Sequence, residues 1–171
     1  RWQDYSSAHN ALIKFRNHGI PTLAGEQTTT TTTTTTTDYY SNDSIFAPDA
    51  TLIGVDGNTI ILQGGHKILK VYQTLSMLRK ASMVGSWMVQ SVKSNWLRRT
   101  CTIRWIATNN PPPTPTLEGM DRFTLNEDGE VETMEMLELS FGGNAITDSE
   151  LIKSIVMVME KSDGVMPGAD I

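Results

Sequence analysis

The sequence predicts an α+β domain in which a mostly antiparallel sheet packs against helices. Near the start of the chain, apolar residues recur at spacings of three and four, as they do on one face of an amphipathic helix. In the second half, apolar and polar residues alternate instead, which is the period of a strand with one buried face. Turn residues separate the alternating segments, so we expect the strands to be joined as hairpins.

Three segments have the helical pattern. One face of the first helix is formed by Tyr5, Ala8, Leu12 and Phe15. Gly19 and Pro21 are expected to end it. A second helix follows Gly64-Gly65, with Tyr72 on its apolar stripe. Thr147 and Glu150 have the spacing of a capping box, which predicts the start of a third helix.

Three pairs of strands are expected. They are residues 51–55 with 59–62, 87–92 with 100–107, and 120–125 with 130–139. Asp56-Gly57-Asn58 is the turn of the first pair, and residues 93–95 are a plausible connection in the second. Asp128-Gly129 lies in the last turn and is a favoured turn dipeptide.

Asp121 stands out because it lies in an otherwise apolar row. It shares one face of its predicted strand with Phe123 and Leu125. A loop of two or four residues would continue this face onto the next strand. The residues expected there are Glu132, Met134, Met136 and Glu138. Two environments remain open for Asp121: a buried pocket, or the strand surface, where it would face water or pair with Arg104 or Arg122.

Composition excludes several classes of function. The chain has 171 residues, with 14 Lys and Arg against 19 Asp and Glu, and this balance argues against binding a nucleic-acid backbone. No apolar stretch approaches the roughly 20 residues that span a bilayer. One cysteine, Cys101, excludes an internal disulfide and a cysteine-based zinc site. We expect an intracellular, reducing compartment, or an organelle if the start at Arg1 reflects processing.

We expect two parts along the chain. Residues 1–143 form the α+β domain, and residues 144–171 an added C-terminal helix and tail. Within the domain, residues 28–37 are all threonine. This run has no apolar periodicity to direct its burial, so we assign no function to it.

Three motifs resemble the nuclear transport factor 2-like superfamily, which includes the ketosteroid isomerases and the SnoaL-like polyketide cyclases. They are YSNDSIFAPD at residues 40–49, GGHKI at 64–68 and LEGMDRFTLNEDGEVETM at 117–134. The resemblance covers roughly residues 5–141. It implies a strongly curved sheet wrapped on helices, which forms a cone with an apolar pocket.

The resemblance also implies roles for two acids. The isomerase branch has a catalytic base in a pattern like F-x-D-P, whereas here Pro48 takes the acid's place and Asp49 follows it. A displacement by one residue turns a side chain to the opposite face of an extended segment. Asp121 matches the family's second acid, which stays protonated in an apolar pocket and donates a hydrogen bond to the developing oxyanion. The family's tyrosine donor on the first helix has no certain counterpart.

Six residues are candidates for the pocket lining: Tyr72, Trp105, Phe123, Met134, Met136 and Glu138. We expect a non-catalytic binding or accessory module that docks on other protein subunits or on a second copy of itself, and that holds an apolar small ligand. The alternative is a cofactor-free isomerase, cyclase or dehydratase that acts on an apolar carbonyl compound, with Asp121 and Asp49 as acid and base. Neither hypothesis needs a cofactor or a metal ion.

Overall fold

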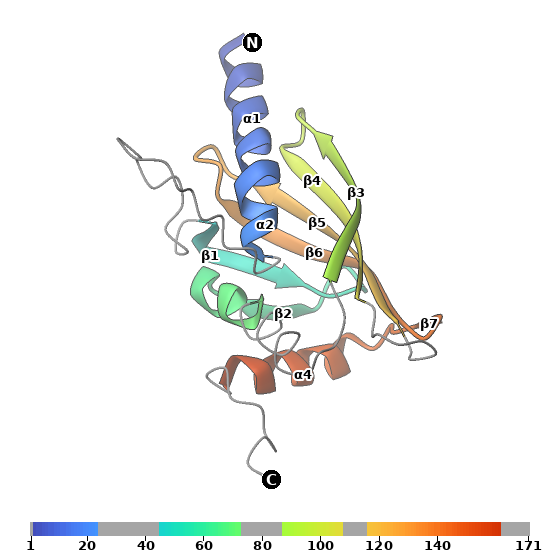
Figure 1. Ribbon diagram of the computed structural model, residues 1–171. Helices are drawn as coiled ribbons and strands as arrows, with labels where there is room; N and C mark the ends of the chain where they lie inside the picture. The colour runs from blue at the N-terminus through green and yellow to red at the C-terminus, as the bar shows by residue number, and fades with distance from the viewer. Residues whose placement is uncertain (1, 24–44, 73–86, 108–115, 162–171) are drawn as a thin grey trace, which may run out of the picture.

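The computed structural model describes residues 2–23, 45–72, 87–107 and 116–161 (Figure 1). The strands are β1 (Phe46–Ile53), β2 (Ile60–Gln63), β3 (Trp87–Asn95), β4 (Thr100–Ala107), β5 (Leu117–Leu125), β6 (Val131–Phe141) and β7 (Asn144–Ala145). They form one curved sheet in the order β2-β1-β6-β5-β4-β3, with β7 paired to β6. The helices are α1 (Trp2–Lys14), α2 (Ile20–Leu23) and α4 (Ser149–Lys161), and residues 65–72 are also helical.

The predicted fold class is confirmed. The three hairpins β1–β2, β3–β4 and β5–β6 are antiparallel, and β4 and β5 also pair in this way. The parallel pair of β1 and β6 joins the first hairpin to the others. The β3–β4 connection lies at residues 96–99 rather than at the predicted 93–95, because β3 continues through Asn95.

The first helix lies across one face of the sheet, which we call the inner face (Figure 1). Its predicted apolar face is confirmed, since Ala8, Leu12 and Phe15 are buried. The predicted end at Gly19 is wrong. The chain passes through a π-helical turn at Phe15–Gly19 and continues as α2, where Pro21 lies in the first turn and is tolerated.

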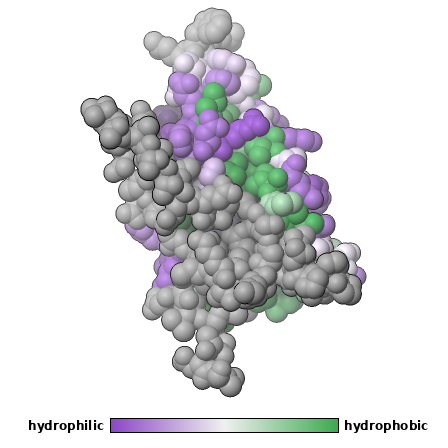
Figure 2. All heavy atoms as spheres, in the orientation of Figure 1, coloured by the Kyte–Doolittle hydropathy of each residue, from purple (hydrophilic) through white to green (hydrophobic). Residues whose placement is uncertain are grey.

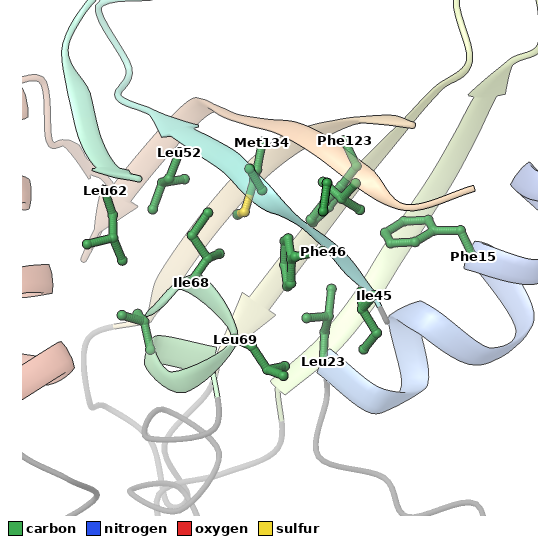
Figure 3. Packing of buried hydrophobic residues seen from close by; sticks show 14 of the residues in the cluster. Phe15, Leu23, Ile45, Phe46, Leu52, Leu62, Ile68, Leu69, Phe123 and Met134 are labelled. Carbon is green, nitrogen blue, oxygen red and sulfur yellow. The ribbon is translucent and has the colours of Figure 1, made fainter. Parts of the chain in front are cut away.

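The core lies between these helices and the inner face (Figure 3). Phe15 and Leu23 of the helical segment point toward Ile45, Phe46 and the sheet (Figure 3). Alternate residues of β4 and β5 supply the other side, which confirms the strand period predicted for both. The fully buried members from these two strands are Cys101, Ile103, Phe123 and Leu125.

The segment at 65–72 packs tightly against β1. A Cβ atom at Gly65 would come within 2.3 Å of the Ala47 carbonyl oxygen, so only glycine permits this approach. The segment buries Ile68 and Val71, as the helical stripe predicts. The rest of that predicted helix, the threonine run at 28–37 and the proline-rich stretch at 109–115 lie outside the described residues.

The C-terminal helix, α4, packs beside β2 and buries Ile152 and Val156 in the same core (Figure 1). Its predicted capping residue is corrected by one position. Asp148, rather than Thr147, accepts hydrogen bonds from the backbone N–H groups of Glu150 and Leu151, each at 3.1 Å. Among the described residues, no helix is long and apolar enough to cross a membrane.

Candidate functional site

Asp121 lies on the inner face, near the middle of β5. It pairs across the sheet with Ile103 of β4 on one side and Met136 of β6 on the other. Its exposed fraction is 3%, and it is the one buried acid among the described residues. The sequence left open whether this carboxyl faces water or a buried apolar environment. The structure places it in the buried one.

The carboxyl of Asp121 is held by an indole. Trp105 donates a hydrogen bond from Nε1 to Asp121 Oδ2, at 2.8 Å. The predicted alternatives are wrong, because Arg122 pairs with Glu135 and Arg104 pairs with Glu138. Within the described part of the chain, the indole N–H is the one donor that contacts this carboxyl.

The lack of a side chain at Gly119 allows the indole of Trp105 to reach Asp121. Trp105 and Gly119 are direct cross-strand partners, and the indole occupies the space that a side chain at Gly119 would fill. A Cβ atom at Gly119 would come within 2.4 Å of Trp105 Cζ2 and 2.9 Å of Nε1. The sequence prediction missed this residue, although a glycine inside a strand is a signal of close approach by another group.

Burial raises the pKa of Asp121 from the ordinary value of 3.8 to about 7. The physical cause is desolvation, since a carboxylate without water is destabilised relative to the neutral acid. The hydrogen bond from Trp105 acts in the opposite direction and lowers the pKa. Desolvation prevails, so near neutral pH the group is divided between its acid and carboxylate forms.

The inner face changes character at Asp121. On one side Phe123 and Met134 are buried core residues, with exposed fractions of 0% and 4%. Met136 lies directly opposite Asp121, Trp105 and Leu139 lie on the other side, and these three are only partly buried. Asp121 therefore lies at the border between the filled core and a more open apolar surface formed by these three residues.

Tyr72 reaches the inner face from the helical segment 65–72. Its hydroxyl contacts Met134 Sδ at 3.2 Å, and its ring stacks with that of Phe46 at a centroid distance of 6.4 Å. Five of the six predicted lining residues thus share the inner face with Asp121: Tyr72, Trp105, Phe123, Met134 and Met136.

The placement of Glu138 in the pocket is wrong. An irregularity between Met120 and Asp121 makes Asp121 pair with Met136 and Met120 pair with Glu138, so β6 has one extra residue there. Glu138 consequently lies on the outer face, where it accepts a hydrogen bond from Arg104 Nη2 at 3.2 Å. Glu132, also predicted on the inner face, is exposed.

Asp49 does not join Asp121. It lies on β1 next to Pro48, and both residues are exposed, whereas Ala47 and Ala50 on either side are buried. Pro48, at the position of the family's acid, is therefore as exposed as Asp49, and neither side chain of this pair faces the core. The two acids do not form a pair, and no cluster of potential metal ligands occurs among the described residues.

Gly119→Ala is expected to displace Trp105 and break its hydrogen bond to Asp121. Loss of this bond should raise the pKa of Asp121 further and destabilise the fold by about 1–3 kcal/mol. The carboxyl titration followed by NMR measures the first effect, and urea unfolding measures the second. Trp105→Phe is the matched variant, since it removes the N–H donor and keeps a ring. If Gly119→Ala leaves the Asp121 titration unchanged, the role assigned to Gly119 is wrong.

A second feature was not predicted from the sequence. The β3–β4 hairpin end lies beside α1 (Figure 1), and between them is a hollow of about 670 Å³. Its lining consists of Ala8, Trp96, Leu97, Arg98, Arg99, Thr124, Leu125 and Glu132. The residues from the turn carry no recognisable motif, so only the folded chain brings them together with α1 and β5.

No protein-family model and no curated protein sequence matches the chain. Two solved structures have a distant likeness to the chain. One is an uncharacterized bacterial protein with a cystatin-like fold from Silicibacter pomeroyi, with 12% identity, coverage of 69% of this chain and 74% of that chain, and a TM-score of 0.46. Another is a steroid delta-isomerase from Pseudomonas aeruginosa, with 12% identity, coverage of 88% of both chains and a TM-score of 0.44. At identities of 12% and TM-scores of 0.46 and 0.44, neither likeness carries an argument about this chain.

Proposed function

We propose that the chain is a non-catalytic binding module of the nuclear transport factor 2-like type, and that it holds an apolar small molecule beside Asp121. The observation that carries this proposal is the position of one buried acid at the edge of the core, next to partly buried apolar side chains. A structural role alone gives no reason for an acid here, since a buried carboxyl destabilises the fold. Such a group is a candidate for ligand recognition.

The chemistry of Asp121 defines the ligand. Oδ2 accepts the Trp105 N–H, which leaves the acid proton on Oδ1, where it can be donated. A carbonyl or ether oxygen accepts this hydrogen bond. The rest of the ligand would contact Trp105, Met136 and Leu139, and these side chains favour an apolar body. The proposed ligand is therefore apolar, with one accepting oxygen.

Prodan, a naphthalene ketone whose emission shifts to shorter wavelength in apolar surroundings, tests this proposal. We expect it to bind more tightly at about pH 5 than at about pH 9, because the ketone needs the protonated form of Asp121, whose pKa is about 7. Asp121→Leu keeps the branched shape, replaces the carboxyl oxygens with methyl groups and has no donor, and should weaken binding about 10-fold or more. The measurement is a fluorescence titration of each variant at both pH values.

Asp49→Asn is the control, because it removes an acid that is exposed and turned away from the core. It should leave both the affinity for prodan and its pH dependence unchanged. If Asp121→Leu binds prodan as well as the unsubstituted chain does, and with the same pH dependence, the proposed role of Asp121 in ligand binding is wrong.

A second candidate is a cofactor-free isomerase, cyclase or dehydratase acting on an apolar carbonyl compound. It is favoured by the burial of Asp121, because desolvation raises the pKa of this acid to about 7, which is close to the optimum for a general acid or base near neutral pH. The exposed position of Asp49 supports the binding module over this candidate. The enzyme hypothesis needs Asp49 as the base beside Asp121, and Asp49 is turned away from the core. Turnover of a β,γ-unsaturated ketone that is lost in Asp121→Asn would decide for the enzyme.

Docking on other subunits, formation of a homodimer and an intracellular location stay predictions from the sequence. Purification of the chain with its native partners would test the first two of these.

A further inference from the structure

The hollow between α1 and the β3–β4 hairpin end has the features of a second binding site. Its walls are apolar where Ala8 and Leu125 lie, and both of these residues are buried. Its rim carries Trp96 and Leu97, whose exposed fractions are 42% and 74%. Exposure of large apolar side chains to water is unfavourable, so their position beside a hollow indicates a binding surface.

The charges in the lining select the ligand. Arg98 and Arg99 come from the turn, and Glu132 lies on β6. Two positive charges and one negative charge leave a net charge of +1, which complements a ligand with a single negative charge. The fork of N–H groups on a guanidinium matches a carboxylate.

Both arginines are available for such a ligand. Arg98 has no ion pair within the described part of the chain, and its backbone N–H donates to Asn95 Oδ1 at 3.2 Å. Arg99 Nη1 is 3.9 Å from Glu127 Oε1, at the long limit for an ion pair. Glu127 is largely exposed, so this contact is screened by water and holds the guanidinium weakly.

The indole of Trp96 is held in place by α1. The rings of Tyr5 and Trp96 are nearly perpendicular at a centroid distance of 4.6 Å, and His9 stacks on Tyr5 at 5.5 Å. A ring oriented in this way offers a flat surface to a flat ligand. An aromatic body therefore suits the hollow as well as an aliphatic one does.

Arg99 is also the one described non-glycine residue with a positive φ, at 50°. Glycine adopts this left-handed conformation more readily, and an arginine there is less stable by about 1 kcal/mol. The backbone of Arg99 is needed in this conformation, because its carbonyl oxygen accepts the Leu125 N–H at 2.9 Å. The arginine side chain is not needed for that bond, and strained residues of this kind gather at ligand sites.

We infer that this hollow binds a small monocarboxylate with a flat apolar body, whose carboxylate lies between Arg98 and Arg99 and whose body packs against Trp96 and Leu97. The site is separate from Asp121 and needs a ligand of different charge. This inference can therefore be correct or wrong whether or not a ligand binds beside Asp121.

Binding of naphthoate, measured by isothermal titration calorimetry, tests the inference. Arg98→Gln and Arg99→Gly should each weaken binding about 10-fold or more, because each removes a charge-assisted hydrogen bond. Arg99→Gly separates binding from folding, since glycine relieves the positive φ. Its stability to urea should be equal to or greater than that of the unsubstituted chain while its affinity falls.

Lys93→Gln is the matched control, because it removes the same charge from the same hairpin at a residue outside the lining. It should leave the affinity unchanged. Naphthalene methanol, which has the same ring system without the charge, should bind at least 10-fold more weakly. The inference is overturned if naphthoate does not bind, if Arg99→Gly binds it equally well, or if Asp121→Leu abolishes its binding.

Discussion

Asp121→Asn is expected to be more stable than the unsubstituted chain at about pH 8. At this pH the carboxyl, with its pKa of about 7, is mostly ionised in a buried environment. Asparagine has the same shape, stays neutral and still accepts the hydrogen bond from Trp105 Nε1. Its amide N–H₂ lacks a partner of its own, which offsets part of the gain. We expect a net increase of about 1–3 kcal/mol in the free energy of unfolding.

The pH dependence of stability should change in the same variant. The folded pKa of Asp121, about 7, lies above the unfolded value of 3.8, so between these values the folded state binds the additional proton. The free energy of unfolding of the unsubstituted chain therefore falls as pH rises through this window, by up to about 4 kcal/mol for a shift from 3.8 to about 7. Asp121→Asn should lack this fall.

Urea unfolding at a series of pH values measures both effects. Asp56 has a pKa lowered to about 2 by hydrogen bonds from Thr59 and Asn58. The stability that Asp56 contributes to the fold is present above pH 3.8 and is lost as pH falls toward 2. This pH range lies below the range from 3.8 to about 7 in which Asp121 acts, so the two effects can be separated. Asp49→Asn is the control and should keep the pH dependence of the unsubstituted chain. Equal curves for Asp121→Asn and the unsubstituted chain would mean that Asp121 is not buried.

Phe123→Ala is expected to destabilise the fold by about 3–5 kcal/mol, the largest loss that we predict for one side chain. Phe123 is 0% exposed and joins the sheet to the first helical segment, with its ring centroid 5.0 Å from that of Phe15. Truncation would leave a cavity between the two layers and remove the aromatic contact. Domains are stable by roughly 5–15 kcal/mol, so this variant is expected to be partly unfolded at moderate temperature.

Thermal and urea unfolding measure this loss. Phe141→Ala is the matched control, because Phe141 lies at the end of the neighbouring strand β6 and is half exposed. It removes the same atoms and should have a much smaller effect. A loss in Phe123→Ala no larger than that in Phe141→Ala would show that Phe123 of β5 does not pack against Phe15 of the π-helical turn.

The elements with a clear period were predictable from the sequence. The alternation around Asp121 placed Phe123 and Leu125 with it on one face, and the structure confirms that all three are buried. The spacing in the first helix likewise identified its buried face. In both cases the apolar pattern itself determines which side of the element packs against the core.

The errors arose where one residue changes the register. Glu138 was placed on the inner face because strict alternation along β6 was assumed, and the irregularity opposite Asp121 reverses the faces beyond it. Gly19 was expected to end a helix that instead continues through a π-helical turn. Such local irregularities depend on packing with other elements, so the sequence period alone does not reveal them.

The candidate site was predictable only in part. The alternating pattern singled out Asp121, but its partner Trp105 lies across the sheet and was predicted only as a residue of the apolar pocket lining. The hydrogen bond between them depends on Gly119, which makes room for the indole. These three residues lie on two strands, and their contact follows from the register of β4 with β5, which the sequence did not specify.

The pKa of Asp121, measured by NMR titration of its ¹³C-labelled side-chain carboxyl in the intact chain, tests most directly whether a buried, protonatable acid is the centre of this site. Asp121→Asn identifies the resonance by its disappearance. We expect the carboxyl to titrate with a pKa of about 7. A pKa near the ordinary value of 3.8 would contradict the burial of Asp121 and, with it, the proposed hydrogen bond to a ligand at neutral pH.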